Sequence, residues 1–281
     1  MKKIISFLIL AIIFPVFLFS CKTNTSGGSS AKSGKSSAAA VSSSSKSTAS
    51  IQSSSASSQD GSSLVYPSKA KNNGKNIKDR ELFCLGDSIL GDMKVSGYGV
   101  YLKAELDGKM ELDSKHARPD LGIFGLEDPN GRTSRHVLAY LEYEINEEKR
   151  KFDIIMINCG IHDINDGTVP LEEYKSNLKK IIALVKANAN DVVWCMTSPA
   201  PMDATSFYKN VPVYNYEAAK IMIENEIFIV DLFSITKSYG AVEAITQGPG
   251  DVHFNPEISE KQGIDIAKIM MENYYNYDLN R

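Results

Sequence analysis

Residues 82–90 read LFCLGDSIL, so that four apolar residues lead directly into a glycine, an aspartate and a serine. A short apolar run of this kind is typical of a strand that is covered on both faces. Gly86 allows the chain to turn sharply where the strand ends. Ser88 would then present its hydroxyl at the edge of a sheet, with its backbone N–H near a helix N-terminus, which suits an oxyanion. The alternative is that Asp87 or Ser88 only caps a helix.

Similar apolar runs recur along the chain and alternate with stretches of helical period. We expect strands at 82–85, 121–124, 154–159, 192–197 and 227–230, and helices at 134–148, 171–187, 216–224 and 259–274. Strands that alternate with helices build a parallel sheet with helices on both faces. The expected fold is therefore a three-layer α/β/α domain around a mostly parallel, five-stranded, flavodoxin-like sheet, with Trp194 in its core.

The N-terminus has the composition of a targeting segment. Two lysines precede an apolar run, Ile4–Phe19, which is shorter than the ~20 residues that span a bilayer and has the form of a secretory signal. The run ends in LFSC at 18–21, which resembles the lipobox of bacterial lipoproteins. Residues 1–20 would then be a signal peptide, and Cys21 would be the lipidated first residue of the mature chain. The alternative is an uncleaved anchor helix.

A serine-rich linker, residues 21–64, is expected between this segment and a folded domain at 65–281. Its central part, 26–63, holds 19 serines among 38 residues and only four charges. Such a segment buries too little apolar surface to offset the entropy of ordering it, so we expect a flexible tether. Together with Cys21, it predicts an extracytoplasmic lipoprotein of the bacterial cell envelope, anchored in the membrane through its lipid.

Charge and cysteine usage exclude some classes of protein. Without the two leader lysines and the net +3 of the linker, residues 64–281 carry a net charge of −8, which argues against nucleic-acid binding. Cys84, Cys159 and Cys195 each lie in an apolar run and are expected to be buried thiols. A Cys84–Cys159 disulfide is the alternative in an oxidising compartment. No CxxC or His-rich spacing suggests a metal, and we expect no cofactor.

In parallel α/β folds, sites form where strands reach their carboxyl ends. Besides 86–88, three glycine-containing loops stand out: NGRTS at 130–134, GIHD at 160–163 and GPGDVHF at 248–254. His162 and His253 lie in two of these loops, and loops carry much of the function in such folds. His116 and His136 lack such a setting and are expected at the surface or in the core. Thr197–Pro201 follows a strand and should line the mouth of the site.

These four blocks, in this order, resemble the SGNH, or GDSL, hydrolases, with a Gly-x-His-Asp variant of the third block. The resemblance covers residues 80–275. It implies that Ser88 is the nucleophile and that His253 is the general base and then the acid. It also implies that the N–H groups of Ser88 and Gly131 bind the oxyanion. The family's third oxyanion donor is an asparagine side chain, and His162 stands at that position; Asn158 is the alternative.

The catalytic acid also departs from the family pattern. The family places its aspartate three residues before the histidine, which is Gly250 in this sequence. Asp251, two residues before, would orient His253 instead; otherwise the site is a Ser–His dyad and Asp251 is a turn residue. Arg132 and Arg135 flank the expected oxyanion turn and either bind an anionic group or are ordinary surface residues.

The resemblance implies a serine ester hydrolase that acts on a small-molecule or polysaccharide ester. The extracytoplasmic setting suggests O-acetylated carbohydrate. Two alternatives stay open: an O-acyltransferase of the same fold, and a non-catalytic, lipid-anchored binding protein. The second is motivated by His162 and Gly250, where the family has its asparagine and aspartate. The sequence does not indicate an oligomeric state.

Overall fold

The computed structural model describes residue 64 and residues 80–91, 97–107, 109–116 and 133–274, with the backbone alone for 111–116, 166 and 272–274. Contacts divide the chain into two units, Met1–Ala49 and Ser50–Arg281, and all described residues belong to the second. Some predicted features lie outside the described residues: the signal peptide, Cys21, the serine-rich segment 26–63, the strand at 121–124, and Gly131 and Arg132.

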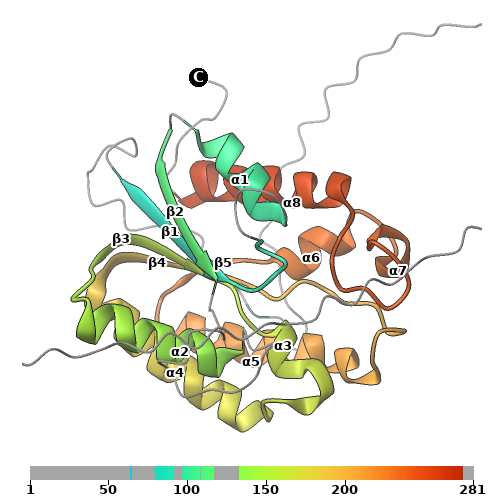
Figure 1. Cartoon of the computed structure of the whole chain (residues 1–281), viewed down its shortest axis with the longest axis horizontal. Helices are drawn as coiled ribbons and strands as arrows, with labels where there is room; N and C mark the ends of the chain where they lie inside the picture. Colours follow the sequence, from blue (N-terminus) through green and yellow to red (C-terminus); the bar gives the residue numbers. More distant parts are fainter. Residues whose placement is uncertain (1–63, 65–79, 92–96, 108, 117–132, 275–281) are drawn as a thin grey trace, which may run out of the picture. The chain divides into compact units, whose positions relative to one another are not determined.

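The described strands form one parallel sheet (Figure 1). They are β1 (Glu81–Gly86), β2 (Glu111–His116), β3 (Phe152–Ile157), β4 (Ala189–Cys195) and β5 (Phe228–Val230), in the order β2-β1-β3-β4-β5. This is the strand order of flavodoxin-like sheets, whose direction of winding reverses between β1 and β3. The prediction of an α/β fold with a parallel sheet is therefore confirmed.

Four strands lie within three residues of their predicted limits, and one described strand was not predicted. The strand that pairs with β1 at the edge of the sheet is Glu111–His116, whereas the expected run at 121–124 lies outside the described residues. Its sequence, ELDSKH, holds one large apolar residue. An edge strand bonds to a neighbour on one side only and need not be apolar on both faces, so a search for continuous apolar runs misses it.

The helices pack on both faces of the sheet. They are α1 (Tyr98–Leu106), α2 (Ser134–Glu142), α3 (Ile161–Ile164), α4 (Leu171–Asn188), α5 (Val211–Glu224), α6 (Leu232–Lys237), α7 (Val242–Ile245) and α8 (Pro256–Lys268), with short 3₁₀- or π-helical pieces at Tyr143–Glu147, Asn165–Gly167, Ser206–Asn210 and Ile269–Tyr274. Figure 1 shows α2, α4 and α5 on one face and α1 and α8 on the other. Among the described helices, none is long and apolar enough to span a membrane.

Each face of the sheet has its own hydrophobic core. Leu85, Ile157 and Trp194 pack with α2, α4 and α5, whereas Leu82, Val193 and Val230 pack with α1 and α8. Trp194 is fully buried, as predicted. Cys84, Cys159 and Cys195 are buried free thiols, so the alternative of a Cys84–Cys159 disulfide is wrong. The reason is geometric: Cys84 belongs to one core and Cys159 to the other, on opposite faces of the sheet.

Candidate active site

A serine, a histidine and an aspartate meet at the carboxyl edge of the sheet. Ser88 lies in the turn after β1, and His253 lies in the loop before α8. The Oγ of Ser88 is 2.8 Å from Nε2 of His253, and the other ring nitrogen, Nδ1, is 2.7 Å from Oδ1 of Asp251. The structure therefore joins these three residues into one hydrogen-bonded chain.

The turn that carries Ser88 is closed by its neighbour. The buried carboxylate of Asp87 accepts the N–H of Ile89 at 2.9 Å, and the N–H of Gly91 donates to the carbonyl of Asp87 at 3.2 Å. Asp87 therefore closes this turn, but neither Asp87 nor Ser88 caps a helix. The expected helix does not begin at the serine, because 88–90 is a turn and α1 begins at Tyr98.

The loop that carries His253 is held on both sides. The backbone N–H of Gln247 donates to the carbonyl of His253, and Asn255 caps α8 by accepting the N–H of Ile258. Oδ1 of Asp251 accepts both the backbone N–H of His253, at 2.9 Å, and its ring. These bonds, the backbone one foremost, lower the pKa of Asp251. An ionised Asp251 requires the proton on Nδ1 and leaves Nε2 free to accept the proton of Ser88.

The backbone explains why the carboxylate that contacts His253 stands at 251 and not at 250. Gly250 has a φ of 74°, in the left-handed region that disfavours residues with a Cβ. Its N–H donates to the carboxylate of Asp203 at 3.2 Å, which ties the loop to the segment after β4. An aspartate at the family's usual position would be strained in this loop, whereas Asp251 reaches the imidazole without strain.

The two candidates for a side-chain oxyanion donor differ in their surroundings. His162 lies in α3, directly after β3, and is half-buried. Asn158 is buried, and its Nδ2 donates to the carbonyls of Cys195 and Met196 at 3.1 and 3.0 Å. Both amide hydrogens of Asn158 are therefore used to join the ends of β3 and β4. The alternative prediction, that Asn158 donates to the oxyanion, is therefore wrong, and His162 is the remaining candidate.

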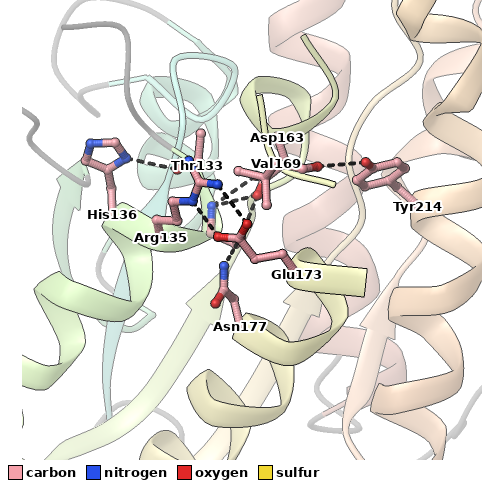
Figure 2. Close-up of polar contacts among 9 residues, drawn as sticks. Thr133, Arg135, His136, Asp163, Val169, Glu173, Asn177 and Tyr214 are labelled. Carbon is pink, nitrogen blue, oxygen red and sulfur yellow. Dashed lines mark hydrogen bonds and ion pairs between the residues drawn. The ribbon is translucent and has the colours of Figure 1, made fainter. Parts of the chain in front are cut away.

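A buried carboxylate beside His162 was not singled out from the sequence. Asp163 is fully buried and accepts the N–H of Ser134 at 2.9 Å and its hydroxyl at 2.5 Å. Asn177 of α4 donates to that same hydroxyl oxygen at 3.0 Å. Burial, with a smaller contribution from Asp87, raises the pKa of Asp163 to about 7. Figure 2 shows these contacts among α2, α3 and α4.

Other residues named from the sequence have structural roles. Nε and one Nη of Arg135 bind Glu173 at 2.5 and 2.7 Å, so the anion-binding interpretation of Arg135 is wrong (Figure 2). His136 is buried against Thr133, as expected for a core residue.

Thr197, Ser198 and Pro199, which follow β4, are also buried, so they do not line the mouth of the site. The exposed part of that connection comes later, at Met202 and Asp203. Among the described side chains, no group of three or more potential metal ligands occurs.

Comparison with solved structures finds the same architecture. An acetylxylan esterase from Geobacillus stearothermophilus has a TM-score of 0.54 at 16% identity, and the match covers 74% of this chain and 99% of that one. A lipase/acylhydrolase from Enterococcus faecalis has a TM-score of 0.51 at 15% identity, with 68% and 95% covered. At these identities, the likeness shows the fold alone. No curated protein matches the chain significantly.

A family model gives the firmer assignment. The model that describes the GDSL-like lipase/acylhydrolase family matches residues 84–261, which include both Ser88 and His253. This match spans more than half of the chain, so the protein belongs to the GDSL-like lipase/acylhydrolase family and is a carboxylic ester hydrolase.

Proposed function

We propose that the protein is an extracytoplasmic, lipid-anchored serine esterase that forms an acyl-enzyme on Ser88. The observation that carries the catalytic part is the unbroken chain from Ser88 to His253 at 2.8 Å and from His253 to Asp251 at 2.7 Å. This geometry supports a triad over a Ser–His dyad. It also weakens the case for a non-catalytic binding protein, since a carboxylate orients the base although the family's position holds Gly250.

The reaction follows from these contacts. Nε2 of His253 takes the hydroxyl proton while Oγ of Ser88 attacks the ester carbonyl carbon, and Asp251 stabilises the imidazolium that forms. The oxyanion binds the N–H of Ser88 and an imidazole N–H of His162, and the family pattern adds the N–H of Gly131. The intermediate then expels the alcohol, which leaves with the proton from His253. Water, activated by His253, releases the acid and restores Ser88.

O-acetylated carbohydrate is the substrate class that we propose. The structural neighbour that is an acetylxylan esterase and the proposed location outside the cytoplasm both support it. The side chain of His253 is 42% exposed. An acyl-enzyme at Ser88 would therefore be open to water, which favours hydrolysis over transfer of the acyl group to a second alcohol.

We also propose that the mature chain begins at lipidated Cys21 and that the serine-rich segment holds the domain away from the membrane. The sequence features that support this are the apolar run ending in LFSC at 18–21 and the composition of 26–63. Lipid chains bind membranes through their buried methylene groups, and two or more chains together give stable anchoring.

The test of the catalytic proposal is acetate release from an aryl acetate and from acetylated xylan. We expect Ser88→Ala and His253→Ala each to lower turnover more than ~10³-fold, with the double variant little worse, because the two residues act as one unit. A sugar alcohol added as acceptor separates the enzyme classes: acetyl transfer to it in place of acetate release would identify an acyltransferase. Wild-type rates in Ser88→Ala would rule out the nucleophile.

A further inference from the structure

We infer that Asp163 is a positioning residue of this esterase: its buried carboxylate holds the short helix α3 against α2 and thereby fixes His162, its neighbour, as an oxyanion donor. The inference rests on the proposed role of His162. Asp163 takes no part in the chain of Ser88, His253 and Asp251, yet it is fully buried. No cation among the described side chains offsets this burial. Burying a carboxylate in this way is costly, so its presence requires a reason.

Helix α3 needs external support to hold its shape. It has four residues, Ile161–Ile164, and helices of that length are not stable by themselves. Ile161, Asp163 and Ile164 are buried, whereas His162 is only half-buried. The turn is therefore anchored by three of its side chains, and the fourth, the imidazole of His162, is the one that is only half-buried.

Of the three buried side chains of α3, only that of Asp163 is polar, and its hydrogen-bond network connects α3 with α2 and α4. Its carboxylate accepts from the N–H and the hydroxyl of Ser134, the first residue of α2. The hydroxyl oxygen of Ser134 in turn accepts from Nδ2 of Asn177 on α4. Each hydrogen in this network points at an acceptor when Asp163 is ionised. A protonated Asp163 would add a hydrogen to Ser134, which already provides two donors, so the geometry fits the carboxylate.

The buried carboxylate of Asp163 lowers the stability of the folded protein, which argues against a purely structural role for this residue. Burial raises the pKa of Asp163 to about 7, and Asp87 adds to the shift. Among the described residues, Cys159, Tyr174 and Tyr214 are also coupled to Asp163. Their neutral forms predominate near neutral pH, and their raised pKa values keep them neutral to higher pH. An amide at position 163 would avoid the penalty, so the carboxylate is better explained by the geometry that it enforces.

The experiment uses the full chain and measures kcat, KM and Tm with an aryl acetate. We expect Asp163→Asn and Ser134→Ala each to lower kcat about 10-fold with KM within about twofold, because a slightly displaced donor weakens the transition state rather than substrate binding. His162→Ala should lower kcat by ~10²-fold, and adding either change to it should cost less than about twofold more.

A matched control is available in α6. Asp231 also accepts the N–H and the hydroxyl of a serine, Ser234, at 2.9 and 2.8 Å, and it is buried. We expect Asp231→Asn to change Tm but not kcat. The inference is overturned if Asp163→Asn and Ser134→Ala keep wild-type kcat, if His162→Ala does, or if the losses multiply with that of His162→Ala. Failure of the proposed function is a separate result, namely wild-type activity in Ser88→Ala.

Discussion

At the scale of single residues, the role of Asp251 decides between a Ser–His–Asp triad and a Ser–His dyad. Its carboxylate binds both the backbone and the ring of His253. We expect Asp251→Asn to lower kcat on the order of 10³–10⁴-fold, because an amide no longer fixes the tautomer or stabilises the imidazolium. Steady-state hydrolysis of an aryl acetate across pH measures the loss.

Glu257 provides the control for that change. It lies in the first turn of α8, is exposed and pairs with Lys261 at 2.8 Å. Glu257→Gln removes a nearby carboxylate of the same charge without touching His253, so its kcat should equal that of the wild type. A loss below about tenfold in Asp251→Asn would instead favour a Ser–His dyad.

The raised pKa of Asp163 predicts that the stability of the folded protein depends on pH in an unusual way. The folded protein raises its pKa from 3.8 to about 7, so between these values the folded state binds a proton that the unfolded state has released. The free energy of unfolding should therefore fall as the pH rises from 4 to 7, by roughly 4 kcal/mol from this group. Denaturant melts should show that Asp163→Asn lacks this component. An equal slope in the variant would contradict the prediction.

At the scale of elements, one glycine sets how closely α8 approaches α1. A Cβ at Gly263 would lie 2.6 Å from the backbone nitrogen of Leu102 and from Cβ of Tyr101. We expect Gly263→Ala to destabilise the fold by about 1–3 kcal/mol, since this overpacking outweighs the better helix propensity of alanine. Gly248→Ala is the control, because a Cβ there meets nothing within 4 Å. Thermal melts of both variants measure the difference, and equal Tm values would show that the helices separate freely.

At the scale of the whole molecule, the proposed lipid anchor divides the chain into a membrane-bound end and a catalytic domain. We expect Cys21→Ser to leave the precursor unprocessed or to release the protein from the membrane fraction, because the acceptor of the lipid is lost. Membrane fractionation and metabolic labelling with a fatty acid measure this. Cys84→Ser is the control, since Cys84 is a buried thiol of the domain. Continued labelling and maturation of Cys21→Ser would rule out a lipoprotein.

Much of this protein could be predicted from the order of its residues. Apolar runs separated by helical periods predict the parallel sheet, because burial on both faces requires such runs. The glycine-containing loops after β1 and β3 and before α8 place Ser88, His162 and His253 at one edge, because parallel strands end there together. The apolar pattern did not predict the strand at Glu111–His116, since an edge strand need not be apolar on both faces.

Only the tertiary structure decided which polar groups are partners. Ser88 and His253 are 165 positions apart, and Ser134 and Asp163 are 29 apart. The amide of Asn158 is used by two carbonyls of the next strand, which removes it as an oxyanion donor. Gly250 has a left-handed φ, and Asp251 is the carboxylate that contacts the ring of His253. Local pattern cannot determine these outcomes, because a buried hydrogen-bonding group takes its partner from whichever distant segment the packing brings against it.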